Sequence, residues 1–382
     1  MILPIVVVAF NRANSLKRLL HSLDEANYTG VNSVPLIISI DKSPSNRDVL
    51  KVAEDFKWNY GDKEIRYQEK NLGLREHVIK CGKISQEFGG VIILEDDLFV
   101  SPNFYRYALE SLSFCATNDK IGGISLFSHK LNVHNNYPFD IYQEGYDNFY
   151  LQFASSWGQL WSDKQFTEFL GWYESEARTL NENLPPYVKQ WSSKSWLKYF
   201  ISYLIETNRY FFYPTVSLTT NFGDQGTHQE KNSNAFQVPI SYATNKQEFR
   251  FVDLSDSKSV YDANFENIFI AEALGLDRKD TIIDLNGTLP LTTDKSKKHL
   301  ISSRRWNYEI VQTFARSMRP IESNIFHQQP GSELFLYNLQ KKKRNPYKTR
   351  IEDEFSYHFK NITHRRSYEI FKAMTLARFF RK

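Results

Sequence analysis

The feature that most constrains the fold is the alternation of strand-like and helix-like segments in the first third of the chain. Ile2–Ala9, Pro35–Ile40 and Val91–Leu94 are continuous aliphatic runs, typical of strands buried on both faces of a parallel sheet. Apolar residues at helical spacing separate these runs. With Glu64–Gln68 and Ile121–Phe127 as further strands, the order predicts an α/β fold with a mostly parallel, doubly wound sheet and flanking helices.

The rest of the chain is less regular. Helices are predicted at Asp163–Glu176 and Trp191–Thr207, a strand within 211–223, and helical patches at Leu334–Leu339 and Tyr368–Phe380. The pattern changes after residue 128, and the last stretch is basic. We therefore expect three parts, at 1–128, 129–332 and 333–382, the last of them a helical basic tail.

Composition excludes several classes of protein. A chain with 41% hydrophobic and 24% charged residues is typical of a folded protein and not of a disordered or fibrous one. No apolar run approaches the roughly 18–20 residues that span a bilayer. Ile2–Ala9 has no basic segment before it and is typical of a strand, not of a signal peptide. Cys81 and Cys115 make neither a disulfide framework nor a zinc site, which favours a reducing, cytoplasmic setting.

Aromatic residues are unusually frequent and locally concentrated. They make up 15% of the chain, and five tryptophans lie between residues 157 and 196. Flat rings with polar edges suit carbohydrates, but most aromatic side chains in proteins belong to the core. The sequence leaves both interpretations open.

Positive charge is concentrated at the C-terminal end. Residues 340–382 carry 13 Lys and Arg but four Asp and Glu, so this tail is +9 in a chain whose net charge is +4. A basic tail on a mildly acidic body argues against a nucleic-acid-binding protein. Lys341–Arg344, with Phe371, Leu376, Phe379 and Phe380, suits an anionic membrane surface. The alternative is a docked helix followed by an unstructured basic end.

Three carboxylates directly follow the third predicted strand, at Glu95–Asp97. Adjacent carboxylates repel one another, so strand propensity alone does not account for them. Ligands of parallel α/β sheets bind beyond the carboxyl ends of the strands. Here the triplet suits Mg²⁺ or Mn²⁺ bridging to phosphate oxygens. The alternative is that the acids cap the helix that starts near Pro102.

The ends of the first two strands carry Asn11, Arg12 and Asp41. An arginine there can bind a diphosphate, and a carboxylate can accept from a base N–H or a ribose hydroxyl. Helix capping is the alternative. Neither GxGxxG nor GxxxxGK[ST] occurs at a strand–helix turn, which argues against a dinucleotide dehydrogenase and a P-loop NTPase.

Taken in order, these segments resemble the GT-A nucleotide-sugar glycosyltransferases. The matching motifs are VVVAFNR at 6–12, SID at 39–41, VIILEDDLFVSPNFYRY at 91–107, SSWGQLW at 155–161 and YPTVSLTTNFGDQGTH at 213–228. They are most similar to the N-acetylglucosaminyltransferases that start complex N-glycans and to bacterial surface-polysaccharide transferases with the same acidic loop. The resemblance covers roughly residues 2–230 and leaves the tail uncovered.

The resemblance implies roles for the matching residues. Asp97 would be the metal ligand, Asp96 would lie near the ribose, and Glu95 near the donor sugar or a metal-bound water. Arg12 and Asp41 would hold the base and phosphates.

Four further residues belong to the implied donor site. Phe10 and Asn11 are in the same motif as Arg12. His77 lies near the position of a base-contacting histidine in the family, although its spacing to the triplet is shorter here. His228 would contact the diphosphate or complete the metal shell, and the alternative is a loop histidine in solvent.

The sequence departs from the family at the general base. The eukaryotic relatives carry an aspartate in a Trp-Asp-Asp-Trp segment, whereas residues 191–200 read WSSKSWLKYF and contain no carboxylate. An inverting transfer needs a base within hydrogen-bond reach of the acceptor hydroxyl. Asp163, just past the Trp-Gly motif, is the preferred candidate and Asp224 the second. A retaining mechanism stays open.

The expected function is therefore metal-dependent transfer of a hexose or N-acetylhexosamine, with inversion, from a nucleotide sugar to a glycan or lipid-linked acceptor. A UDP-sugar is the favoured donor, and the expected setting is surface-polysaccharide synthesis on the cytoplasmic side of the plasma membrane. Residues 1–128 would bind the donor and 129–332 the acceptor. One alternative is a sugar-1-phosphate nucleotidyltransferase, which FNRANS at 10–15 disfavours because it lacks glycine. The other is a non-catalytic carbohydrate-binding protein on the same fold.

Overall fold

The computed structural model describes residues 2–175, 179–224, 234, 236–243, 248–290, 296–347, 356–359 and 363–379. The chain forms two compact units. The first comprises Met1–His134 and Ile141–Phe269, and the second comprises Asn135–Asp140 and Ile270–Lys382. The boundary expected at 128/129 falls inside the first unit, and that at 332/333 falls inside the second.

Within the described residues, nine strands form the sheet of the first unit in the order β11-β7-β9-β6-β8-β4-β1-β2-β3. They are β1 Ile5–Ala9, β2 Leu36–Ile40, β3 Lys63–Tyr67, β4 Gly90–Glu95, β6 Ile121–Ser125, β7 Asn148–Leu151, β8 Gln159–Ser162, β9 Tyr210–Pro214 and β11 Val260–Tyr261. β1 pairs in parallel with β2 and β4, and β2 pairs in parallel with β3. The pairs β4–β8, β6–β8 and β7–β9 are antiparallel. The prediction of an α/β fold with a mostly parallel sheet is confirmed.

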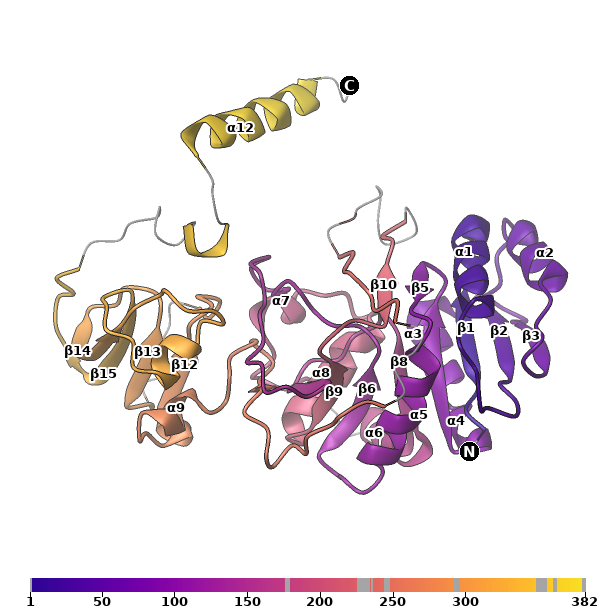
Figure 1. Cartoon of the computed structure of the whole chain (residues 1–382), viewed down its shortest axis with the longest axis horizontal. Coiled ribbons are helices and arrows are strands. Elements are labelled where there is room, and N and C mark those ends of the chain that lie inside the picture. The colour runs from indigo at the N-terminus through magenta and orange to yellow at the C-terminus, as the bar shows by residue number, and fades with distance from the viewer. Residues whose placement is uncertain are drawn as a thin grey trace. The chain divides into compact units, whose positions relative to one another are not determined.

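A separate two-stranded ribbon joins β5 (Leu98–Val100) to β10 (Thr219–Asn221) in antiparallel pairing. The helices of the first unit are α1 Ala13–Asp24, α2 Arg47–Asp55, α3 Gly73–Gly82, α4 Ser85–Phe88, α5 Phe104–Cys115, α6 Asp163–Glu174, α7 Pro186–Lys189 and α8 Trp196–Glu206. In Figure 1, α1 and α2 lie together beside β1, β2 and β3. The helices predicted at Asp163–Glu176 and Trp191–Thr207 are thus present as α6 and α8.

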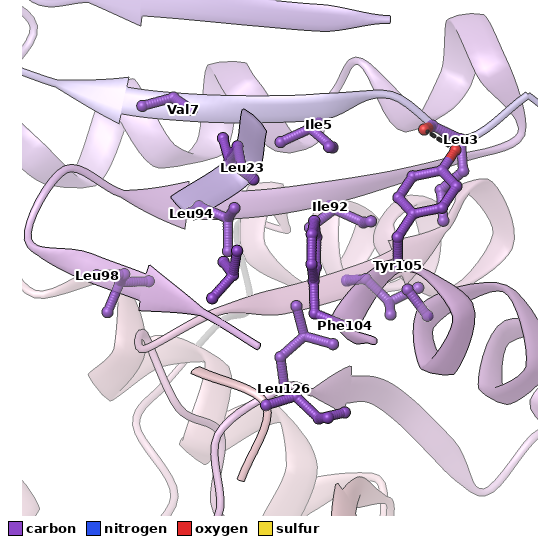
Figure 2. Packing of buried hydrophobic residues seen from close by; sticks show 14 of the residues in the cluster. Leu3, Ile5, Val7, Leu23, Ile92, Leu94, Leu98, Phe104, Tyr105 and Leu126 are labelled. Atoms are coloured by element: carbon purple, nitrogen blue, oxygen red, sulfur yellow. Dashed lines mark hydrogen bonds between the residues drawn. The ribbon is translucent and has the colours of Figure 1, made fainter. Parts of the chain in front are cut away.

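One face of the sheet is closed by α1 and α5. Alternate residues of β1 and β4 point to this face and form one buried cluster with the leucines of α1 and with Phe104 (Figure 2). The hydroxyl of Tyr105 donates to the carbonyl of Leu3 at 2.7 Å, so its polar end is satisfied inside the core. Each fully buried aliphatic side chain contributes about 1.5–3 kcal/mol to stability, and these contacts hold the ends of β1 and β4 in fixed positions.

The tryptophan-rich stretch contributes mainly to a second core. The rings of Trp161, Phe166 and Phe200 pack together, with centroid separations of 5.1 and 5.5 Å from Trp161. Trp196 is buried and lies 5.8 Å from Trp161. These residues come from β8, α6 and α8, so their aromatic character is explained by helix–sheet packing. Trp157 is half-buried.

In its described residues, the second unit contains a four-stranded sheet in the order β12-β13-β15-β14. Its elements are α9 Ile270–Ala273, the 3₁₀ turn Arg278–Asp280, β12 Thr281–Asp284, β13 His299–Ser302, β14 Tyr308–Phe314, α10 Ser323–Phe326, β15 Leu334–Lys342 and α12 His364–Phe379. The prediction of a helical patch at Leu334–Leu339 is wrong, because this run is the first part of β15. A short apolar run cannot be assigned by periodicity alone, and pairing with β13 and β14 decides it.

The predicted helix at Tyr368–Phe380 corresponds to α12. Of the helices in the described part of the chain, none combines the length and hydrophobicity that crossing a bilayer requires.

Candidate functional site

The ends of three parallel strands meet at one edge of the first unit's sheet. Val8 is in register with Glu95, and Ala9 with Ile40, so the residues after β1, β2 and β4 are neighbours. A cavity of about 550 Å³ opens at this edge. It is lined by Val8, Ala9, Phe10, Asn11, Arg12, Asp41, Asn71, Leu72, Gly73, Leu74, Arg75, Glu76, His77, Glu95, Asp96, Asp97, Lys194 and Asp224. Nine of the eleven residues that the sequence nominates therefore lie together.

Arg12 is the centre of the ionic contacts in the cavity. Its Nη1 donates to Oδ2 of Asp97 at 2.8 Å, and its Nη2 donates to Oδ1 of Asp96. The Asp96 side chain is 3% exposed, whereas that of Arg12 is 21% exposed. The guanidinium thus binds both aspartates from the open side of the cavity.

Burial and mutual repulsion perturb the carboxylates. Burial raises the pKa of Asp96 to about 6, although the charge of Arg12 opposes this. Burial, reinforced by the charge of Asp97, raises the pKa of Glu95 to about 8. For Arg12, burial alone would lower the pKa, but Asp96 and Asp97 outweigh it and the pKa lies above its ordinary value. The raised pKa values mean that burial and the neighbouring like charges disfavour the ionised carboxylates, and that the charge of Arg12 offsets only part of this effect.

The residues present fit a hard divalent cation. No three His, Cys, Asp or Glu side chains among the described residues form a ready-made metal-binding group. However, Oε1 of Glu95 and Oδ1 of Asp97 are buried and have no hydrogen-bond partner in the described structure. The cavity lining contains six carboxyl groups and three basic side chains, so it is acidic. Mg²⁺ and Mn²⁺ are commonly held by one or two carboxylates together with substrate phosphates, which matches this arrangement.

Asp41 holds the loop between β3 and α3. Its Oδ1 accepts from the backbone N–H of Leu72 at 2.8 Å, and its Oδ2 accepts from that of Gly73 at 2.9 Å. Gly73 has φ +73°, a left-handed conformation that glycine adopts without steric cost. Asp41 therefore shapes the cavity wall at the start of α3, and these bonds occupy much of its acceptor capacity.

His77 lines the same wall, from α3. It is buried, and its Nε2 lies 2.7 Å from Oγ of Ser39 on β2. Burial lowers the pKa of His77 to about 4, although Asp41 opposes the shift. The imidazole is therefore neutral at physiological pH and can act as a hydrogen-bonding group but not as a cation.

Asp224 reaches the cavity from the segment after β10. Its Oδ2 accepts from Oγ of Ser15 at 2.7 Å and from Nη2 of Arg18, both on α1. Burial would raise the pKa of Asp224, but the hydrogen bonds from Arg18 and Ser15 dominate and lower it. The backbone N–H of Phe222 also donates to the carbonyl of Asp97 at 3.0 Å. Through these hydrogen bonds, the segment after β10 connects the turn that carries Glu95–Asp97 (the acidic turn) to α1.

The two remaining nominated residues are not seen at the cavity. Ser162, just before Asp163, is in register with Gly90, the first residue of β4, whereas the acidic triplet begins at its last residue. Asp163 therefore lies at the opposite edge of the sheet, where it opens α6 and accepts from Oγ1 of Thr167. Because β8 is antiparallel to β4, the preferred position for a general base is not at the cavity. His228 lies outside the described residues.

Three basic residues at the cavity or beside it were not nominated from the sequence. Arg75 and Lys194 line the cavity, and Arg18 binds Asp224. Arg18 stacks on the ring of Phe222, with its Cζ 3.7 Å from the ring centroid. Arg75 donates to the carbonyl of Ser193 at 2.7 Å, which brings the segment carrying Lys194 to the cavity. Each contact joins residues more than 100 positions apart, and no local motif marks such pairs.

Comparisons with known proteins give weak similarity. No model of a known protein family matches the chain, and no curated protein matches its sequence. Among solved structures, the chain is similar to residues 1–349 of S. aureus TarS in complex with UDP-GlcNAc. The identity is 13%, the match covers 60% of each chain, and the TM-score is 0.38.

Two other solved structures show comparable likeness. The mannosyltransferase PcManGT of Pyrobaculum calidifontis, in complex with GDP-Man and Mn²⁺, is 10% identical over 45% of this chain and 46% of that chain, with a TM-score of 0.31. Apo mouse xyloside xylosyltransferase 1 is 13% identical over 55% of this chain and 84% of that chain, with a TM-score of 0.35. The match to the TarS fragment spans less than two thirds of its length.

Proposed function

We propose that this protein is a metal-dependent glycosyltransferase that uses a nucleotide-diphosphate sugar, with a UDP-sugar as the favoured donor. The observation that carries the proposal is the acidic turn Glu95–Asp97, which lines a cavity of about 550 Å³ at the carboxyl ends of the parallel strands. That edge is where α/β sheets bind nucleotides. The acceptor would be a glycan or a lipid-linked sugar, in surface-polysaccharide synthesis.

The donor would lie along the wall formed by β1, β2 and α3. Phe10 and Asn11 line this wall, and the neutral imidazole of His77 would bind an uncharged part of the nucleotide. Asp41 would act mainly by holding the backbone of Leu72 and Gly73 in place. Arg12 would bind the diphosphate, since guanidinium groups pair well with phosphate oxygens.

The reaction would form a bond between the acceptor oxygen and the anomeric carbon, while the bond from that carbon to the diphosphate breaks. The nucleoside diphosphate leaves with the bonding electrons. A divalent cation held by Asp97 would supply charge stabilisation for that leaving group. Asp96 and Glu95 would support the site from its buried side, and Arg12 would hold the departing diphosphate.

Asp224 is our candidate for the general base of an inverting transfer. It lines the cavity, and both of its bonds from α1 are made to Oδ2. Oδ1 would take the proton from the acceptor hydroxyl as the new glycosidic bond forms. The low pKa of Asp224 keeps it ionised at neutral pH, although it also makes the carboxylate a weak base.

Binding of nucleotide sugars with Mn²⁺ tests the proposal directly. We expect one nucleotide sugar of a panel to raise the melting temperature by several degrees, because ligand at about 100 times Kd adds about 2.7 kcal/mol to the stability of the native state. Differential scanning fluorimetry with and without EDTA measures this. Release of nucleoside diphosphate from that donor would identify a transferase, whereas consumption of pyrophosphate would identify a nucleotidyltransferase. Binding without either reaction would identify a non-catalytic protein.

We also propose that the C-terminal helix binds an anionic membrane surface. On α12, Tyr368, Phe371 and Met374 are 64–69% exposed, and Arg365 beside them is 90% exposed. Apolar groups interleaved with basic ones on an exposed helix suit the interface of an anionic bilayer.

Removal of residues 364–382 is expected to abolish binding to vesicles that contain phosphatidylserine. The truncation leaves the second unit's sheet complete, because β15 ends at Lys342. Each basic residue near an anionic surface contributes about 1 kcal/mol, so binding of the full chain should also weaken at high salt. Vesicle co-sedimentation measures both effects, with neutral phosphatidylcholine vesicles as the control. Equal binding by the full and shortened chains would rule out this role.

A further inference from the structure

Arg12 forms ion pairs with two of the carboxylates that a cation would bind, those of Asp96 and Asp97. Its two terminal nitrogens bind Asp96 and Asp97 from the open side of the cavity, while Oδ1 of Asp97 and Oε1 of Glu95 have no partner in the described structure. The guanidinium therefore binds one carboxylate oxygen of each aspartate, and the other buried oxygens named here have no hydrogen-bond donor in the described structure. A second positive charge cannot enter this turn without repelling Arg12.

The surroundings allow Arg12 to leave its present position. It is the residue that precedes the first turn of α1, and 21% of its side chain is exposed. The backbone carbonyl of Asp224 lies 3.4 Å from Nη1 of Arg12. A displaced guanidinium would remain inside an acidic cavity, where an incoming diphosphate is its best partner.

We infer that Arg12 is an internal counterion that competes with the divalent cation for Asp96 and Asp97. Without ligand, Arg12 neutralises the acidic turn and keeps the affinity for a free cation low. When a diphosphate enters with a cation, Arg12 transfers to the phosphate oxygens and the carboxylates become free. Donor and cation therefore bind together, and neither binds well alone. This inference rests on the proposed function and adds a binding order to it.

Titration of the protein with MnCl₂ in the absence of nucleotide tests the inference. We expect Arg12→Met to bind Mn²⁺ about tenfold or more tightly than the wild type, as for a typical coupling between two ligands. Lys17→Met is the matched control. It removes a positive charge from the same helix, but Lys17 is exposed and does not line the cavity. Its Mn²⁺ affinity should stay near that of the wild type. Isothermal titration calorimetry or the EPR signal of free Mn²⁺ gives the affinities.

Thermal stability provides a second readout, because Arg12→Met leaves Asp96 and Asp97 without their counterion. This variant should melt below the wild type in EDTA, and Mn²⁺ should restore more of its stability than it adds to the wild type. Arg12→Lys, which keeps one positive charge, should lie between the wild type and Arg12→Met in Mn²⁺ affinity and in melting temperature. It replaces Arg12→Met in both experiments if the methionine variant does not fold.

The outcomes separate the inference from the proposed function. Equal Mn²⁺ affinity in the wild type and Arg12→Met overturns the inference, and the function stands if a nucleotide sugar still stabilises the protein. Equal tightening in Arg12→Met and Lys17→Met also overturns it, because net charge alone would then explain the effect. Absence of Mn²⁺ binding in every variant, with no stabilisation by any donor, overturns both.

Discussion

Asp97→Ala is expected to lower the rate of nucleoside diphosphate release by about 10³-fold or more, because it removes the side chain that would hold the leaving-group cation. The fold should be unaffected. The substitution removes the hydrogen bond from Arg12, but the backbone contacts of this turn survive, among them the carbonyl of Asp97 that accepts from Phe222. The rate is measured with the donor identified by thermal shift, and circular dichroism checks the fold.

Asp48→Ala is the matched control for this experiment. Asp48 is exposed in the first turn of α2 and does not line the cavity, so the same substitution there should leave the rate unchanged. If Asp97→Ala kept full activity, or if the wild type worked equally well in EDTA, the metal-dependent mechanism would be wrong.

The largest effect on stability is expected for Gly82→Ala. Gly82 is the last residue of α3, and a Cβ atom built on it would lie 2.1 Å from Cζ of Phe166. Phe166 is 1% exposed and packs 5.1 Å from Trp161, so its ring has no free space to enter. Overpacking of this kind typically costs about 1–3 kcal/mol. We expect a fall of several degrees in melting temperature.

Gly171→Ala, in helix α6, is expected to have the opposite effect and to raise the stability of the protein. Gly171 is exposed in the interior of α6, and a Cβ atom there meets no atom within 4 Å. Alanine should stabilise the protein by about 0.5–1 kcal/mol, because glycine loses more backbone entropy on folding. Urea denaturation measures both variants. Similar effects for Gly82→Ala and Gly171→Ala would contradict the packing described between α3 and α6.

The clustering of nominated residues at the cavity could be predicted because it depends on local patterns and one general rule. Aliphatic runs identify β1, β2 and β4, and parallel pairing brings Arg12, Asp41 and the acidic triplet to the same edge. No knowledge of distant contacts is needed for this step. His77 lies at the same cavity from the middle of α3, where its imidazole contacts Ser39 on β2.

The position of Asp163 could not be predicted in this way. The rule applies to strands that run parallel to β1, and nothing in the sequence QLWS marks β8 as antiparallel to β4. The pairing of Asp224 with Ser15 and Arg18 was equally hidden, since it joins residues separated by more than 200 positions. Tertiary contacts also decide the conformation of Leu334–Leu339, which is strand although its composition also allows a helix.

The ribbon of β5 and β10 has a consequence for the order in which the protein matures on the ribosome. The acidic turn emerges early in translation, but its partners at Thr219–Asn221, Phe222 and Asp224 emerge only after more than half of the chain has been made. A nascent chain released before that point would carry the carboxylates on an unfastened turn. Prematurely terminated products should therefore lack an ordered acidic turn at the cavity.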